Sequence, residues 1–238
     1  MWAGDPVFSP DQTQIIYQFN LIKWEDISQP KIYAHTPQKK FSNGYAPTLA
    51  IDPRAFLALA RTDGSDAIHP IPIELPGQAV GYSWCQPDWH PYDRQKIAVS
   101  FLNAFPGYQD FTIYITNPEG TSIQSLLNPV NNPALIERHR SPAWSPDGNH
   151  IAYVRQVGNQ YAIFIVRADG ADSPGLQITP TNIVQLAPIP DIGTYFFDAI
   201  KEVCWSPDGN YLAFSVYSHA NQQVPMGYDI YTTRRDGS

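Results

Sequence analysis

The sequence predicts an all-β protein built from repeated four-stranded antiparallel units, and three observations carry that prediction. A turn and the strand after it occur twice, as SPAWSPDGNHIAYVRQ at 141–156 and as EVCWSPDGNYLAFSVY at 202–217. A later strand running into a glycine turn occurs three times, as FTIYITNPEG, YAIFIVRADG and YDIYTTRRDG, closed by Gly120, Gly170 and Gly237. No convincing amphipathic helix competes, because the nearest candidate, 132–140, is short and begins at Pro133.

The repeated motif has the residues of a type I turn. Pro146 presets φ near −65° at the second position, Asp147 can accept bonds from nearby backbone N–H groups, and Gly148 can take a left-handed conformation. The same residue types stand at Pro207, Asp208 and Gly209. We therefore interpret these residues, and the matching Asp11, as structural parts of hairpin turns, and we expect positive φ at both glycines.

The strand after the turn is apolar on both of its faces. Residues 151–154 read Ile-Ala-Tyr-Val, whereas a strand with one face in water alternates apolar and polar residues. The sheet that contains this strand should therefore be covered on both sides. Trp144 and Trp205, and by alignment Phe8 and Trp89, are expected to fill space between neighbouring sheets.

Weaker copies of the motif extend the repeat along the chain. Residues 6–19 keep Ser-Pro-Asp but have Gln12 in the glycine position, residues 87–101 keep an aromatic residue two places before Pro91, and residues 49–60 keep little beyond Pro53. These anchors predict five units, at approximately 1–44, 45–80, 81–136, 137–198 and 199–238. Four-stranded units with periods of ~40–50 residues are typical of β-propeller blades.

The pattern W-S-P-D-G-x-x-[IL]-A-[FY], with a later D-[IL]-Y-like strand and D-G turn, resembles the repeat of TolB-like β-propellers. The resemblance implies a single propeller domain over 1–238, in a family that is typically six-bladed. With about five blades visible, we expect the chain to be an incomplete part of a six-bladed ring whose last blade has three strands. A periplasmic or extracellular location is indicated only by this resemblance.

Composition restricts the partners. The chain has 15 Lys and Arg against 22 Asp and Glu, a formal net charge of −7, and no basic stripe that would neutralise the phosphates of a nucleic acid. No apolar run approaches the ~20 residues of a membrane-spanning helix, and the first residues, MWAGDP, show no signal-peptide pattern. We expect Cys85 and Cys204 to be free thiols, with a disulfide between them as the alternative.

Motifs for catalysis and metal binding are weak. GYSWC at 81–85 has Cys85 where a nucleophile elbow needs its second glycine. No two of the six histidines lie within four residues of each other, and no Cys-x-x-Cys occurs. The D-G-x-D turns at 63–66 and 169–172 carry too few carboxylates for calcium. We therefore expect no catalytic residue, no metal and no cofactor.

Geometry places the candidate binding site opposite the Ser-Pro-Asp-Gly turns. Long, aromatic loops at 19–30, 103–111, 128–140, 180–202 and 217–228 should share the face that carries the strand 2–3 loops and the links between blades. Segments 137–140 and 197–202 each lead into an inner strand, so their side chains should meet around the mouth of the central channel. The expected rim comprises Arg138, His139, Arg140, Tyr195, Phe197, Asp198, Lys201, Glu202, Tyr82 and Trp84.

Two interpretations of this rim remain open. Its charges could pair with one another, Arg138 with Glu202 for instance, and close the channel to water. Alternatively they hold a protein or peptide ligand, or an acidic small molecule or glycan, because guanidinium groups bind carboxylates bidentately. The leading hypothesis is a non-enzymatic binding platform for a protein or peptide. The family resemblance also implies two alternatives. One is a carbohydrate-active propeller such as a uronate lyase, which would use Arg138, His139, Arg140 and Tyr195. The other is the non-catalytic gating propeller of a larger peptidase or hydrolase.

Overall fold

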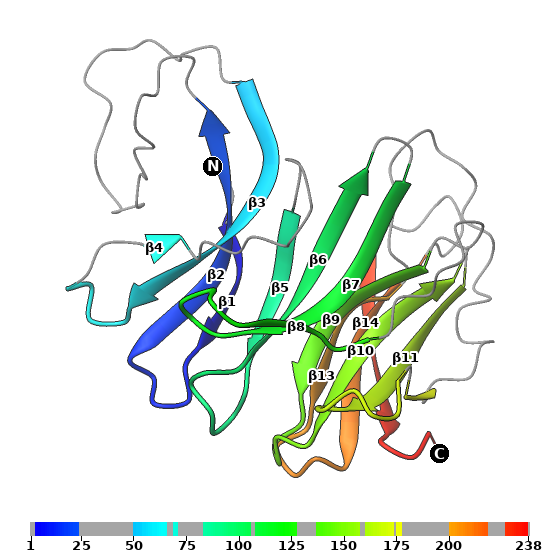
Figure 1. Cartoon of the computed structure of the whole chain (residues 1–238). Helices are drawn as coiled ribbons and strands as arrows, with labels where there is room; N and C mark the ends of the chain where they lie inside the picture. Colours follow the sequence, from blue (N-terminus) through cyan, green and yellow to red (C-terminus); the bar gives the residue numbers. More distant parts are fainter. Residues whose placement is uncertain are drawn as a thin grey trace.

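The computed structural model describes residues 3–23, 50–65, 69–70, 83–105, 108–127, 137–157, 160–173, 175–177, 200–218 and 227–237. These residues form strands β1 to β15 and contain no helix (Figure 1). The described part of the chain therefore has no helix that could cross a membrane. Of the five long loops in which we expected binding, most residues lie outside these ranges.

The strands group into four antiparallel blades in chain order. The first blade is β1 (Ala3–Phe8), β2 (Gln14–Lys23), β3 (Ala50–Arg61) and β4 (His69–Pro70). The second is β5 (Ser83–Trp89), β6 (Ile97–Phe105), β7 (Tyr108–Thr116) and β8 (Ile123–Ser125), and the third is β9 (Glu137–Trp144), β10 (His150–Val157), β11 (Gln160–Arg167) and β12 (Leu176–Gln177). The fourth is β13 (Ile200–Trp205), β14 (Tyr211–Ser218) and β15 (Gly227–Arg234). The described residues of the last blade thus form three strands, as expected.

The blade division differs from the one expected near residue 45. Strand β3 pairs with β2 along most of its length, so the segment around Pro53 is the third strand of the first blade and begins no blade of its own. Three residues of β3, from Asp52 to Arg54, stand opposite Leu21 alone, because Ile51 pairs with Ile22 and Ala55 with Asn20. Proline is tolerated in a strand at such an irregularity, since its missing N–H leaves no ladder bond unmade. The prediction that Pro53 belongs to a turn is therefore wrong, because Pro53 lies within strand β3.

The core lies between the blades, as the apolar strand 151–154 predicted. Ile151 and Tyr153 pack in one cluster with Ile113 of the second blade, whereas Ala152 and Val154 pack in another with Phe214 of the fourth. Each of the four residues is at most 1% exposed. Alternate side chains of β10 thus serve opposite neighbours, and burying such apolar surface is the main driving force that holds the blades together.

The aromatic residues before the turns follow this pattern with one exception. Trp89 and Trp144 are buried in the clusters between blades, and the partly buried Trp205 packs against the cluster between the third and fourth blades. Phe8 was expected to do the same, but it is 56% exposed. Among the described elements the first blade packs on the second, and it is the preceding residue, Val7, that packs against the cluster between these two blades.

The repeated turns have the predicted geometry. Gly148 and Gly209 have φ of 71° and 70°, and the N–H of each donates to the backbone carbonyl of the serine three residues earlier. The glycines that close the later turns, Gly120, Gly170 and Gly237, also have positive φ. In the first blade Gln12 takes the glycine position and adopts φ of 58°.

The four blades are arranged in an open arc (Figure 1). Among the described elements, the first blade packs on the second, and the fourth packs mainly on the third. Of the strands that the structure describes, β1 pairs only with β2, and β15 only with β14. Cys204 is an exposed free thiol, while the side chain of Cys85 lies outside the described residues.

Candidate functional site at the inner strands

The first strand of each of the four blades is its inner strand, and each carries a bulge shortly before the turn that leads to the second strand. The register shifts between Gly4 and Val7 in β1 and between Cys85 and Asp88 in β5. It shifts again between Arg140 and Ala143 in β9 and between Ile200 and Val203 in β13. In each case two residues face one on the partner strand, which bends the inner strand and re-aims its side chains.

Three of these bulges are joined by one hydrogen-bond network. The Gln86 side chain accepts a bond from the Ser141 N–H at 2.9 Å and donates to the Lys201 carbonyl at 3.4 Å. The Ser141 hydroxyl donates to the same carbonyl. Gln86 and Ser141 have φ of 53° and 50°, a left-handed conformation that non-glycine residues adopt at a cost. This axial network therefore links the second, third and fourth blades at one level.

The expected rim residues separate into buried and exposed groups. Arg138 and His139 are 4% and 6% exposed, and Arg140 is half-buried. The His139 ring lies edge-on to Tyr153 at 5.6 Å. These side chains are thus largely inside the third blade rather than free to meet a large partner.

Lys201 and Glu202 form the exposed part of the rim. The Lys201 ammonium lies 3.2 Å from the Glu202 carboxylate and 5.7 Å from the centre of the Tyr228 ring. Tyr228 is 49% exposed, and Ile230, two residues along β15, is 72% exposed. We call these four residues the Lys201 patch.

The two rim segments lie at the same end of their strands. Ser141 contacts the Lys201 carbonyl, and β9 packs beside β13. The remaining rim residues, Tyr82, Tyr195, Phe197 and Asp198, lie outside the described residues, and of Trp84 only the backbone in β5 is described.

An axial pocket lies beside the network. Its volume is about 350 Å³, and it is lined from the second, third and fourth blades by residues that include Asp88, Ser141, Trp144, Glu202, Cys204 and Trp205. Sequence reasoning missed Asp88, because the residue stands next to a turn motif and carried no motif of its own. The equivalent residues in the third and fourth blades are Ala143 and Cys204. An alignment of the repeats would therefore have shown that the second blade has an acidic residue where these two blades have an uncharged one.

The Asp88 carboxyl group has an unusual environment. Part of the residue remains accessible, but burial of the carboxyl group raises its pKa to about 7, and hydrogen bonds from the backbone of Trp144 and Trp89 oppose that rise. The bond from the Trp144 N–H to Oδ2 is 2.6 Å long. A buried carboxylate is costly when no cation pairs with it, and among the described residues no cation is paired with Asp88, so the protonated form is favoured up to near-neutral pH.

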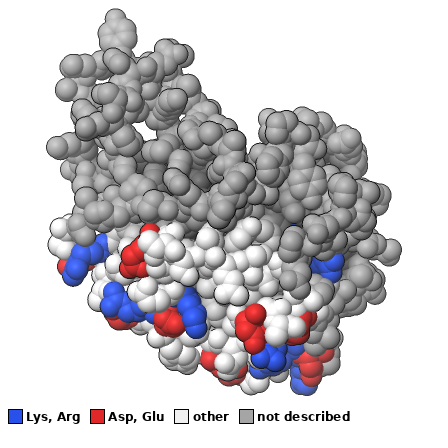
Figure 2. All heavy atoms as spheres, viewed as in Figure 1, with Lys and Arg blue, Asp and Glu red and all other residues white. Residues whose placement is uncertain are grey.

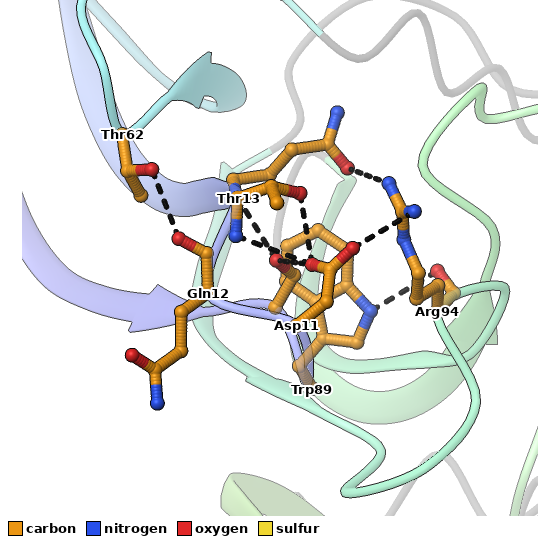
Figure 3. Close-up of polar contacts among 8 residues, drawn as sticks. Asp11, Gln12, Thr13, Thr62, Trp89 and Arg94 are labelled. Atoms are coloured by element: carbon orange, nitrogen blue, oxygen red, sulfur yellow. Dashed lines mark hydrogen bonds and ion pairs between the residues drawn. The ribbon is translucent and has the colours of Figure 1, made fainter.

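The opposite end of the blades carries structural turns. On the face that Figure 2 shows, the visible Lys, Arg, Asp and Glu side chains lie mostly along this edge, with both signs mixed. In the close-up of Figure 3, Asp11 accepts bonds from the first-blade turn and pairs with Arg94 of the second blade at 2.9 Å. The Trp89 indole N–H donates to the Arg94 carbonyl at 3.0 Å. These contacts join two blades and leave the Asp11 carboxylate engaged in structure.

A larger cavity of about 810 Å³ opens at the turn end between the third and fourth blades. Three carboxylates and two guanidinium groups line it, from Asp172, Asp208, Asp236, Arg234 and Arg235. Because the charges are mixed, the cavity favours neither anions nor cations. No group of three or more His, Cys, Asp or Glu side chains suited to a metal ion occurs among the described residues.

Solved structures share this fold, although no family model and no curated protein matches the sequence. A TolB from Acinetobacter baumannii gives a TM-score of 0.51 at 13% identity, over 98% of this chain and 43% of that one. An oligogalacturonate lyase in complex with manganese gives 0.50 at 14% identity, over 96% and 49%. A prolyl endopeptidase gives 0.53 at 13% identity, over 99% and 27%.

These likenesses identify the class of fold. The protein has a β-propeller fold similar to that of TolB and of the other two proteins, and the chain spans about half or less of each of them. At such identities the comparison concerns architecture, because one propeller fold supports many unrelated functions.

Proposed function

We propose that this propeller is a non-enzymatic platform that binds a protein or peptide at the loop end of its inner strands, centred on the Lys201 patch. The observation behind the proposal is a charged pair beside exposed apolar side chains on a rigid sheet. Lys201 and Glu202 offer charges of both signs, while Tyr228 and Ile230 offer apolar area that water now covers. Protein interfaces combine an apolar centre with polar groups of this kind.

The rigid support strengthens the proposal. Lys201 lies in the β13 bulge, and its carbonyl is held by Gln86 and Ser141 from two other blades. A partner that binds there would not have to order the backbone first, which lowers the entropic cost of association.

The lyase alternative receives less support. It places Arg138 and His139 against an acidic sugar, yet these side chains are 4% and 6% exposed. The platform uses the exposed residues of the rim and requires no rearrangement of the third blade.

The test is a selection of peptides from a random displayed library, followed by affinity measurements with two lysine variants. Lys96 is a matched control, because its side chain is 51% exposed and pairs with Asp93 at 3.3 Å, whereas that of Lys201 is 46% exposed and pairs with Glu202 at 3.2 Å. Lys96 belongs to the turn end. Lys201→Ala should weaken binding about fivefold or more, the equivalent of ~1 kcal/mol, and Lys96→Ala should not. Equal affinities for both variants, or a library that yields no binder, would overturn the proposal.

A further inference from the structure

The axial pocket has a charge pattern that the platform proposal does not use. None of the described residues that line it is Lys, Arg or His, while two are acidic, Asp88 and Glu202. Glu202 already has the Lys201 ammonium at 3.2 Å. Asp88 receives hydrogen bonds from the backbone N–H groups of Trp144 and Trp89. No cationic residue among the described lining residues neutralises its charge when it is ionised.

The other walls of the pocket are aromatic and apolar. Trp144 and Trp205 line it together with three proline residues, Pro87, Pro142 and Pro146. Trp faces attract cations through the negative face of the ring. A volume of about 350 Å³ is near the lower bound of small-molecule sites, which are mostly ~300–1,000 Å³.

We propose that the axial pocket binds a small ligand carrying a primary ammonium group, with Asp88 as its counter-ion and the two tryptophans as its apolar walls. An ammonium group supplies the positive charge that the enclosed carboxylate lacks, and the resulting charge-assisted hydrogen bond is stronger than a neutral one. Ionisation of Asp88 and binding of the cation then favour each other, because each removes the cost of the other's desolvation.

This inference goes beyond the proposed platform and can fail independently of it. The Lys201 patch and the pocket share only Glu202, and a peptide can bind the patch whether or not an amine fills the pocket. Affinity for library peptides tests the patch, whereas protection of a thiol in the pocket tests the amine site.

Cys204 provides the reporter, because its free thiol is exposed and lines the same pocket. The experiment measures the rate at which N-ethylmaleimide alkylates Cys204, with mass spectrometry of the peptide that contains this residue as the readout. The pH is about 8, because Asp88 is then ionised while an alkylamine is still protonated. Increasing 2-phenylethylamine should slow the alkylation, and the uncharged 2-phenylethanol at the same concentrations should slow it far less. Nα-acetyl-lysine amide distinguishes a lysine side chain from a free small amine as the natural source.

Asp88→Asn is the decisive variant, because the amide oxygen can still accept the Trp144 N–H while the charge is lost. The amine concentration for half-protection should rise about tenfold or more, the effect of losing a hydrogen bond to a charged group. Glu119→Gln removes a carboxylate from an exposed turn outside the pocket and should leave protection unchanged.

Circular dichroism and the alkylation rate without amine check that each variant is folded. Equal protection by the amine and the alcohol, no protection in the unmodified chain, or undiminished protection in folded Asp88→Asn would each refute the site.

Discussion

At the scale of single residues, the turns show how the space around one Cβ position decides what a substitution costs. Gly64, Gly148 and Gly209 have φ of 69°, 71° and 70°. A Cβ at Gly64 would meet nothing within 4 Å, and one at Gly209 would lie 3.7 Å from Pro146. At Gly148 it would lie 2.6 Å from Nε2 of His90, in the neighbouring blade. The three positions share one backbone conformation and differ in their surroundings.

We predict that alanine at Gly64 or Gly209 lowers the free energy of unfolding by about 1–2 kcal/mol, the cost of the left-handed conformation. Gly148→Ala should cost more, because the His90 ring must also move. Urea unfolding of the three variants measures the difference. Equal losses at Gly148 and Gly64 would show that the His90 contact has no energetic weight.

Gln12 allows the reciprocal experiment. It holds φ of 58° at the position where the third and fourth blades have glycine. Gln12→Gly should therefore raise the free energy of unfolding by up to about 1 kcal/mol, less the greater freedom that glycine gives the unfolded chain. The bond from the Thr62 hydroxyl to the carbonyl of residue 12 (Figure 3) remains available. A loss of stability would mean that the Gln12 side chain contributes more than its backbone conformation costs.

Asp88 makes a prediction about pH. Its folded pKa of about 7 lies above the ordinary value of 3.8, so the folded state binds the proton more tightly than the unfolded state. This group therefore lowers stability as pH rises from about 4 to about 7, and has no further effect above that range. Asp88→Asn should remove that decline, so that the variant gains on the unmodified chain by up to a few kcal/mol between pH 4 and pH 8. Parallel urea-unfolding curves for both proteins across this range would contradict the assignment.

At the scale of elements, the inner hairpin is specified by a short-range set of bonds. In the first, third and fourth blades a serine hydroxyl bonds the turn aspartate and accepts the N–H five residues after the serine. In the second blade His90 replaces serine, and its Nδ1 accepts the N–H groups of Tyr92 and Asp93. Because these bonds are local, the hairpins could be predicted from the sequence.

The turn aspartates predict acid sensitivity. The serine hydroxyl bond is the largest cause that lowers the pKa of Asp11, Asp147 and Asp208, to about 2 in the case of Asp11. A carboxylate with a lowered folded pKa contributes stability above its ordinary value of 3.8, and that contribution is lost as pH falls from about 4 toward 2. Thermal unfolding temperatures should fall over this interval, and the fall should be smaller in Ser206→Ala. Ser125→Ala, whose hydroxyl bonds a carbonyl and no carboxylate, is the control and should keep the full decline.

At the scale of the whole molecule, blade contacts decide what sequence can and cannot predict. Local turn motifs predicted the all-β fold, the hairpins and the burial of residues 151–154. The unit around Pro53 was misassigned because a strand irregularity and a turn both accommodate proline. The link between Gln86 and Lys201 could not be foreseen, since it depends on how two non-consecutive blades approach each other. Asp88 was missed because it carries no motif of its own, and the pocket that it lines is completed by residues of the third and fourth blades.

The axial network predicts that one side chain stabilises three blades. Gln86→Ala removes the acceptor of the Ser141 N–H and the donor to Lys201. Leaving a buried N–H unpaired should lower the free energy of unfolding by about 1–3 kcal/mol. Gln124→Ala, an exposed substitution on β8, should change it by less than about 0.5 kcal/mol. Similar small effects of both substitutions in urea unfolding would show that the network adds little to blade association.

The most direct test of the platform uses photo-cross-linking at the two ends of the propeller. Tyr228 and Tyr92 are both exposed tyrosines, at 49% and 74%, in the Lys201 patch and in a turn of the opposite end. Each is replaced in turn by benzoyl-phenylalanine, which keeps an aromatic ring, and the protein is irradiated with a peptide selected from the displayed library. The account predicts cross-links from position 228 that an excess of unlabelled peptide abolishes, and none from position 92. Cross-links from position 92 alone would place binding at the turn end and contradict the central claim.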